Sequence, residues 1–556
     1  MFKGCTSLTQ TPELSATNLA PHCYSNMFSG CTSLSGNLTL PATTLANYCY
    51  AGMFENCTSL TQAPGLPVTN LTNGCYYRMF NSCTSLTGAP TLPAINLAPY
   101  CYSEMFSNCT SLTQTTTLPA TNLTTYCYSN MFSNCTSLTG TPTLPATNLA
   151  PYCYRSMFKG CTSLNQTTTL PATTLVNYCY EEMFKNCTLL SRAPELPATT
   201  LASYCYFKMF DNCISLNQMP ELPASNLTTG CYQSMFYNCL SLKNAVNLSS
   251  SSLADSCYNG MFENCRRLET VSTLPATSLN SNCYANMFKN CTSLKNAPII
   301  CGTVLANDCC NGMFSLCSSL INPPELPAQN LKESCYKSMF ENCTSLINAP
   351  ELPASSLTNM CYYEMFKNCT SLSSISVKFN DWNDDENSTT MWLENVSENG
   401  TFTKLPSLDS KEHVGASYIP SQWKIIGEIN EVTPDEEEHE ILLTIPLTFT
   451  ALNTSGKIKI KRINYPKEID LWYRYTYDPS LPYDSTSSEW FKYTLFDAEL
   501  NINANQSIQF WNKKNSFNNN ELNYFKFEIK SPLKIKINRK YSIIIKFFFT
   551  LLYFMF

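Results

Sequence analysis

Cysteine is the residue type whose number and spacing in this chain could carry chemistry. The sequence holds 31 cysteines, and most of them recur in pairs eight residues apart, as in CYSNMFSNC at residues 127–135. Regularly spaced thiols can form disulfides, hold a metal ion or act as nucleophiles. Each of these chemistries requires a different arrangement, so the spacing allows each to be examined in turn.

Disulfide pairing within one pair is excluded if the segment between the two cysteines is helical. Cys23 and Cys31 would then lie about 12 Å apart along the helix axis, beyond the reach of a disulfide. Equivalent cysteines on neighbouring repeats would lie about 5 Å apart, which a disulfide can span. We predict instead that the thiols are reduced and buried as small apolar groups, because unpaired cysteine is among the most buried residue types.

A metal site or a catalytic site has little support in the sequence. No C-x-x-C pair occurs, and the adjacent Cys309 and Cys310 reflect a tyrosine-to-cysteine change in one repeat. The acidic segment NDWNDDENS at residues 380–388 lacks the glycine and the glutamate that a calcium loop requires. The histidines lie in separate segments without a neighbouring nucleophile: His22, His413 and His439. We therefore predict no catalytic residue, no cofactor and no metal site.

The glycosylation sequence N-x-S/T also recurs, for example as Asn-Cys-Thr at residues 56–58 and 108–110. In a secreted eukaryotic protein these asparagines would be candidate glycan acceptors. They fall at the same repeat position as a core cysteine, so repetition of one ancestral unit explains them without glycosylation.

The cysteines belong to a 26-residue repeat that organises two-thirds of the chain. A Met-Phe pair stands every 26 residues from Met1 to Met365, which gives fifteen units without an insertion. One unit cannot bury its apolar side chains alone, but stacked units share a continuous core, so the period predicts a solenoid. For one period we predict the core ladder to consist of Cys31, Leu34, Leu40, Leu45, Cys49, Tyr50, Met53, Phe54, Cys57 and Leu60.

The two halves of each unit favour different local structures. In C-Y-x-x-M-F-x-x-C-x-x-L, apolar residues stand at relative positions 0, 1, 4, 5, 8 and 11, the spacing of one helix face. The other half, such as QAPGLPVTNL at residues 62–71, contains prolines that exclude a helix interior and permit only a short, imperfect strand. We therefore predict an α/β repeat solenoid with one short helix and one short strand per unit.

These units resemble the BspA-like leucine-rich repeats of microbial surface proteins, whose repeat carries an Ala-Phe pair, a Gly-Cys, a leucine and an Ile-Pro strand end. The corresponding places are taken here by Met131, Phe132, Cys135, Leu138, Leu144 and Pro145. The resemblance covers residues 1 to about 375, and residues 391–428 resemble the segment that ends such arrays. It implies a leucine-rich-repeat-like solenoid, at the cell surface or secreted, that adheres to a protein or glycan of a host, a matrix or a neighbouring cell.

The composition changes beyond the repeats. Alternating runs such as GKIKIKRI and IDLWYRYTY predict strands, and their number suits a small all-β sandwich domain. NEVTPDEEEHE predicts an acidic linker. The predicted organisation is a solenoid over residues 1–375 with a truncated first unit, a C-terminal cap over 376–429, the linker over 430–440, the β-sandwich over 441–535 and a hydrophobic tail over 536–556.

The two ends of the chain raise separate questions. No signal peptide is visible, and Met1 falls inside a repeat, so we expect the N-terminus to be incomplete. The hydrophobic segment at residues 541–556 is shorter than a membrane-spanning helix and contains Lys546. A final strand, a marginal membrane tail and a mistranslated gene end are the three interpretations, and we favour the last. Membrane contact therefore stays open.

The charge and composition of the chain argue against some classes of partner. A net charge of −6 with only 14% charged residues argues against a nucleic-acid partner, and nothing indicates a small-molecule substrate. We predict a non-enzymatic protein whose extended surface serves adhesion or binding of a protein or glycan. Two alternatives are a viral tail or receptor-binding component with the same solenoid, and an enzyme whose activity lies in the C-terminal β-domain.

Overall fold

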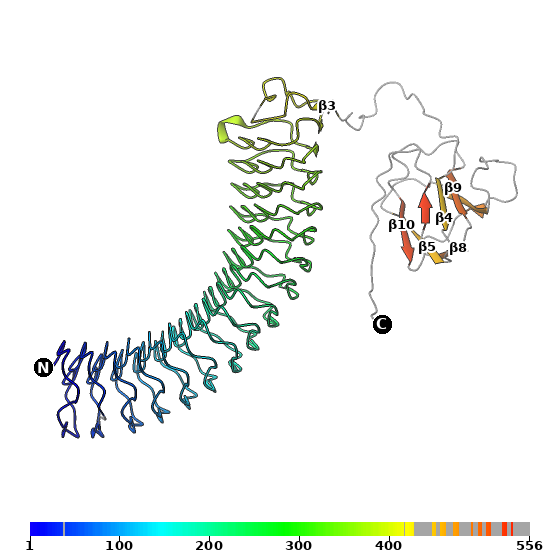
Figure 1. The fold of residues 1–556 in the computed structure, drawn as a ribbon. Helices are drawn as coiled ribbons and strands as arrows, with labels where there is room; N and C mark the ends of the chain where they lie inside the picture. The colour runs from blue at the N-terminus through cyan, green and yellow to red at the C-terminus, as the bar shows by residue number, and fades with distance from the viewer. Residues whose placement is uncertain are drawn as a thin grey trace. The chain divides into compact units, whose positions relative to one another are not determined.

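The structure is a computed structural model that describes residues 1–36, 39–248, 250–415 and 417–427 together with the strands between Leu447 and Ile537. The chain divides into two compact units, Met1–Glu431 and Val432–Phe556. In the first unit the repeats follow one another as stacked coils in sequence order (Figure 1). The boundaries predicted for the cap, linker, sandwich and tail remain predictions; residues 430–440 and the tail beyond Ile537 lie outside the described residues.

The C-Y-x-x-M-F-x-x-C half of each coil forms consecutive tight turns, a segment that we call the turn ribbon. Every fourth residue of the ribbon has a left-handed backbone, with φ of 57° at Tyr126, 54° at Asn130 and 60° at Asn134. A left-handed residue interrupts any α-helix, because helical residues of L-amino acids have negative φ. The short helix predicted for this segment is therefore wrong, and the described coils contain no α-helix.

Backbone hydrogen bonds along the turn ribbon alternate between two directions. The N–H of Ser129 donates to the carbonyl of Tyr126 at 3.2 Å, within the coil, whereas the N–H of Asn130 donates to the carbonyl of Arg155 in the next coil at 2.8 Å. Buried backbone groups require partners, and a helix would supply them all internally. The turn ribbon obtains half of its partners from the next coil, so it depends on stacking.

The apolar spacing explains why the core was predicted although the helix was not formed. Cys127, Met131 and Cys135 stand four residues apart, and all three have an exposed fraction of 0%. On an α-helix, residues four apart are rotated by about 40°, so such a series drifts away from one face. Successive four-residue turns return each member to the same side, and the apolar side chains reach the core in either structure.

The proline-containing half of each coil forms isolated parallel bridges to its neighbours, such as Gln62 to Gly88 and Asn70 to Asn96. Proline lacks an N–H and cannot extend a strand ladder, which opposes longer strands in most coils. The coil that contains Asn244 and Ser252 has no proline in this half and also forms isolated bridges. The first regular strand, β1 (Ser374–Ser376), forms where the last repeat reads SSISV and contains no proline. In the described repeats before β1, the predicted short strand is thus reduced to single bridges.

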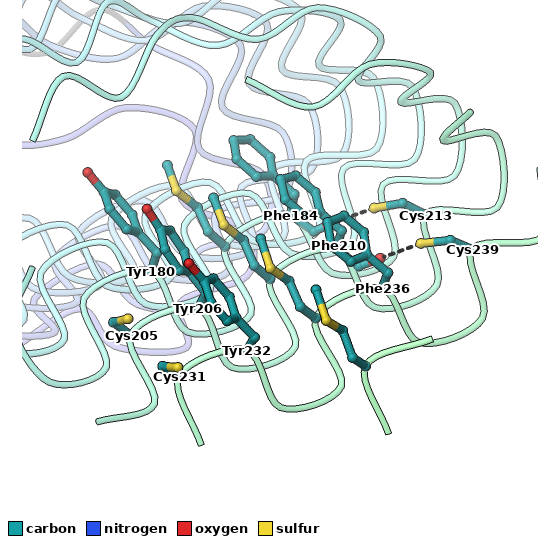
Figure 2. Packing of buried hydrophobic residues seen from close by; sticks show 14 of the residues in the cluster. Tyr180, Phe184, Cys205, Tyr206, Phe210, Cys213, Cys231, Tyr232, Phe236 and Cys239 are labelled. Atoms are coloured by element: carbon teal, nitrogen blue, oxygen red, sulfur yellow. Dashed lines mark hydrogen bonds between the residues drawn. The ribbon is translucent and has the colours of Figure 1, made fainter. Parts of the chain in front are cut away.

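The core of the first unit consists of columns of like side chains from successive coils. Phenylalanine rings stack without interruption from Phe2 to Phe366, with centroids 5.5–5.8 Å apart. A parallel column of tyrosines runs from Tyr24 to Tyr284 at 5.7–6.1 Å. Figure 2 shows part of both columns. Each aromatic residue therefore buries its faces against its own copies one coil away.

A sixteenth turn ribbon follows the fifteen repeats and begins with a short 3₁₀ helix, η1 (Asp384–Glu386). Its left-handed residues are Asn383, Asn387, Met391 and Asn395. Trp392 takes the place of the repeat methionine, because its carbonyl accepts the N–H of Phe366 at 2.9 Å, as the carbonyl of Met365 accepts that of Phe340. Leu393 then stands in the place of the column phenylalanine. The segment predicted as a cap therefore begins with one more coil of altered sequence.

Beyond this coil a buried aromatic cluster and a parallel sheet close the end of the stack. The fully buried Trp392 lies 6.1–6.5 Å, between ring centroids, from Tyr362, Phe366, Phe379, Trp382 and Phe402. The sheet has the order β1-β2-β3, with β2 at Thr401–Lys404 and β3 at Lys424–Gly427. Such closure is what a solenoid needs, because an open end would expose the core columns.

The described residues of the second unit form eight strands in two antiparallel sheets, with the orders β11-β4-β9-β6-β7 and β10-β5-β8. The strands are β4 (Leu447–Ala451), β5 (Gly456–Arg462), β6 (Leu471–Thr476), β7 (Phe491–Lys492), β8 (Glu499–Ile502), β9 (Ser507–Asn512), β10 (Phe525–Lys530) and β11 (Ile535–Ile537). A sandwich requires the two sheets to pack face to face, and this remains a prediction. Across the described residues of both units, no helix is long and apolar enough to cross a membrane.

Candidate functional site

The ten residues predicted as the core ladder all lie inside the stack. Their exposed fractions are 8% or less for Cys31, Leu34, Leu40, Leu45, Cys49, Tyr50, Met53, Phe54, Cys57 and Leu60. None of these side chains can meet a ligand without opening the coils. Their role is to hold the coils in register, and a functional site must be sought among the exposed columns.

The cysteines that follow Met-Phe donate their thiols to backbone carbonyls. From Cys31 to Cys369, each Sγ lies 3.0–3.3 Å from the carbonyl of a column phenylalanine in the preceding coil. Figure 2 shows this contact for Cys213 and Cys239. Burial raises the pKa of the Cys161 thiol to about 12. These thiols are therefore protonated at neutral pH and are poor nucleophiles.

The cysteines form no disulfides in the structure, where all 31 are free. Cys5 and Cys23 are exposed, Cys301 is half-buried and the others are buried. A buried, protonated thiol that already donates a hydrogen bond behaves as a small apolar side chain. The cysteine columns are therefore structural.

The acidic segment at residues 380–388 serves the end of the stack. Its Trp382 is buried, and the ring of His413 stacks on it with centroids 4.2 Å apart. The Nε2 atom of His413 lies 3.0 Å from both carboxylate oxygens of Asp384. Throughout the part of the chain that is described, no group of three or more His, Cys, Asp or Glu side chains is placed to hold a metal ion.

The asparagines of the N-x-S/T sequences form hydrogen-bonded ladders between coils. The side-chain amide of Asn134 donates to the side-chain oxygen of Asn108 at 2.9 Å, and the amide of Asn108 donates to Ser107 at 3.3 Å. The hydroxyl of Thr110 donates to the carbonyl of Thr84 at 3.4 Å. The acceptor amide and the hydroxyl of this sequence are thus engaged in coil stacking, which supports a structural origin for the motif.

A partly exposed aromatic column runs beside the core, and we call it the outer tyrosine column. It comprises Tyr100, Tyr126, Tyr152, Tyr178 and Tyr204, one from each of five successive coils. Their rings stack at 4.5–5.1 Å between centroids, and all five residues have a left-handed backbone. That backbone is unfavourable for a bulky residue, so the contacts between rings offset a local strain.

Charged side chains on the turn ribbons pair from coil to coil. Glu182 binds Lys159 at 2.7 Å and Lys185 at 3.0 Å, and Lys185 also binds Asp211 at 3.0 Å. Partial burial acts to raise the pKa of Glu182, but the hydrogen bonds from the two lysines outweigh it and hold the pKa at about 2. The ribbon surface therefore presents paired charges and little net charge.

The ribbon surface is hollowed beside the outer tyrosine column. This hollow, which we call the trough, has a volume of about 370 Å³. Its lining comes from coils two to six and includes Tyr77, Tyr100, Ser103, Glu104, Tyr126 and Arg155. Two further hollows lie on the proline-containing halves. One of about 510 Å³ is lined by proline, leucine, threonine and glycine, and one of about 390 Å³ is lined mainly by proline and by long polar side chains that include Arg192, Glu195 and Glu221. The trough differs from both of these in its aromatic lining.

Comparison with known families gives the identity of the coils. Residues 1–95, 99–209, 196–321 and 308–407 match the family described as BspA type Leucine rich repeat region (6 copies). These matches cover more than half of the chain. The chain belongs to the BspA-type leucine-rich repeat family. The predicted resemblance and the repeat solenoid are thereby confirmed. A comparison with curated proteins finds no match.

Sequence analysis of this BspA-type array did not identify the outer tyrosine column or the trough. The signal was present, because a tyrosine precedes the second cysteine in six units, including those at Tyr100 and Tyr126. A helical template does not show which exposed positions of neighbouring coils lie side by side. The turn ribbon places equivalent residues of successive coils in contact, and this geometry turns the recurrent tyrosine into a surface.

Proposed function

We propose that this BspA-type protein is a non-enzymatic adhesin, at the cell surface or secreted, whose coils present an extended surface to a protein or glycan of a host, a matrix or a neighbouring cell. The observation that supports the proposal is the segregation of its side chains. Most of the potentially reactive thiols lie inside the stack, whereas tyrosine, asparagine and paired charges recur in columns at its surface.

Exposed columns on a solenoid suit binding for a physical reason. Equivalent positions recur one coil apart on a backbone that neighbouring coils fix by hydrogen bonds. A partner therefore meets many preorganised contacts, and weak contacts that act together give strong attachment. The second unit would act as a β-sandwich spacer or a second binding module, an assignment that rests on its strand content alone.

A bead-adhesion experiment tests the proposal. Beads coated with the full chain are presented to immobilised fibronectin, collagen, mucin and cultured epithelial cells, with albumin-coated beads as the control. We expect saturable attachment to at least one of these surfaces that soluble chain competes away. Attachment no greater than that of albumin beads on every surface would contradict an adhesive role, and turnover of a glycan or peptide by residues 430–537 would favour the enzyme alternative.

A further inference from the structure

We propose that the trough binds a short neutral glycan, with a sugar ring packed against the tyrosines of its wall. This inference rests on the proposed function and names the ligand class and the place where that ligand is held. It is carried by the shape of the trough, by the chemistry of its wall and by the pairing of its charges.

The floor and the two ends of the trough are formed by the residues that follow the Cys-Tyr pair in successive coils. The residue after each Cys-Tyr pair is Tyr77, Ser103, Ser129 and Arg155 in four successive coils. The two serines are small and buried, with exposed fractions of 4% and 2%, and they form the floor of the trough. The large side chains of Tyr77 and Arg155 stand in the same column on either side of them and close its two ends. The floor is therefore two coils long.

One wall of the trough is aromatic. Tyr100 and Tyr126 belong to the outer tyrosine column and stack on each other at 4.8 Å. The column has no ring in the coil before Tyr100, because the equivalent residue there is Gly74. The ring of Tyr48, one coil further back, lies over Gly74 and also lines the trough. Tyr100 has an exposed fraction of 37%. The electron-rich face of a tyrosine attracts groups with partial positive charge, and the C–H groups on one side of a sugar ring are of this kind.

The opposite wall is polar and its charges are neutralised. Glu104 accepts a hydrogen bond from the Tyr77 hydroxyl at 3.2 Å and pairs with Arg78 at 3.3 Å. Arg155 pairs with Glu181 at 2.9 Å. A charged ligand would have to displace these partners, whereas sugar hydroxyls can donate to the carboxylate and accept from the guanidinium while both pairs remain. The trough therefore favours a neutral ligand rich in hydroxyls.

The lining also distinguishes a glycan from a peptide. Pockets that hold peptide side chains are lined largely by aliphatic and aromatic groups, and extended peptides add to a free strand edge. The trough is lined by tyrosine, serine, asparagine, glutamate and arginine, and it lies on turns whose alternate N–H groups already bond to the next coil. Its volume of about 370 Å³ falls within the range of small-ligand sites.

Filling the trough is the first test. Ser103→Tyr places on its floor a side chain that the same column already carries at Tyr77, so the coil should fold. Asn259→Tyr introduces the same residue in the same column, outside the trough, and serves as the matched control. Full-length proteins are titrated by calorimetry and saturation-transfer NMR with neutral oligosaccharides of glucose, galactose and N-acetylglucosamine. We expect Ser103→Tyr to weaken binding at least tenfold and Asn259→Tyr to leave it within twofold of the parent chain.

Removing the aromatic wall is the second test. Tyr100→Ser introduces a residue that the same column tolerates with a left-handed backbone at Ser256 and Ser334. Tyr178→Ser makes the same change in the outer tyrosine column, outside the trough. We expect Tyr100→Ser to lose at least fivefold in affinity for the sugar and Tyr178→Ser to keep the affinity of the parent chain. The saturation-transfer signals of the sugar's ring C–H protons, seen with the parent chain, should weaken with Tyr100→Ser.

The outcomes separate this inference from the proposed function. Equal binding by Ser103→Tyr and Asn259→Tyr, or tighter binding of heparin oligosaccharides or of a proline-rich peptide than of any neutral sugar, would overturn the glycan assignment of the trough. If the parent chain binds no neutral sugar while coated beads still adhere to cells or matrix, the inference fails and adhesion stands. If neither binding nor adhesion is observed, both fail.

Discussion

Asn134→Ala tests the turn ribbon. An α-helix and the turn ribbon predict opposite effects of this substitution on the stability of the coil. Asn134 occupies the second position after Met-Phe and has φ of 60°. In a helix, alanine is a better residue than asparagine by roughly 0.6 kcal/mol, so the substitution would stabilise the coil. In the turn ribbon, the substitution places an alanine in the left-handed region, where asparagine is tolerated far better.

The magnitude follows from two local effects. Holding alanine rather than asparagine in a left-handed conformation costs about 1 kcal/mol. The Asn134 side chain also donates to Asn108 at 2.9 Å, a largely exposed hydrogen bond, whose loss costs about 0.5 kcal/mol. We therefore expect Asn134→Ala to destabilise its coil by about 1.5 kcal/mol, which corresponds to a roughly tenfold change in local opening.

Hydrogen exchange measured by mass spectrometry gives the necessary local resolution, since a long repeat array does not unfold in one step. Peptides that cover residues 126–138 report the amides of Asn134 and Cys135, which bond to Lys159 at 2.7 Å and to Phe132 at 3.2 Å. We expect roughly tenfold faster exchange of these amides in Asn134→Ala. Asn134→Gly is the control, because glycine occupies this place at Gly160 and permits positive φ; its effect should be smaller. Slower or unchanged exchange in the alanine variant would refute the turn ribbon.

Three further predictions concern the thiols and the closed end of the stack. Iodoacetamide at pH 8 should label Cys5, Cys23 and Cys301 in the native chain and the remaining cysteines only after unfolding, which peptide mass mapping checks. Because burial raises the pKa of Cys161 from its ordinary 9.0 to about 12, folding favours the protonated thiol; this stabilisation is complete below pH 9 and is lost as the pH rises toward 12. The urea midpoint followed by circular dichroism should therefore be lower at pH 10.5 than at pH 7.5, and an equal or higher midpoint would contradict this. Trp392→Ala removes the fully buried ring at the end of the stack and should cost about 3–5 kcal/mol locally, seen as faster exchange over residues 362–402 with unchanged exchange in distant coils.

The period of 26 residues was sufficient to predict the stacked core, because burial depends on which residues recur and not on the backbone between them. Phe54, Cys57 and Leu60 face the interior whether their segment is a helix or a series of turns. The sequence also indicated the limits of the strand half, since proline cannot extend a ladder. These two features needed no knowledge of the local dihedral angles.

The turn ribbon was missed because a helical template was applied to a four-residue spacing. The second position after Met-Phe is asparagine or glycine in thirteen of the fifteen units, as at Asn134 and Gly160. These are the residues that accept positive φ most readily, so their recurrence was the available signal. The sixteenth coil was missed because Trp392 and Leu393 replace the Met-Phe pair and the period lengthens by one residue. The trough could not be predicted, since it depends on which columns lie side by side.

The alternation of amide partners along the turn ribbon has a mechanical consequence. In one coil the N–H groups of Tyr126, Tyr128, Asn130, Phe132 and Asn134 all donate to carbonyls of the following coil. These bonds run between coils, so a pulling force along the stack loads them together and in parallel. Rupture of the contact between two coils then requires several hydrogen bonds to break at once. Because the coils are connected in series, each of these contacts carries the same tension. We therefore expect an array built in this way to resist extension along the direction of its stack.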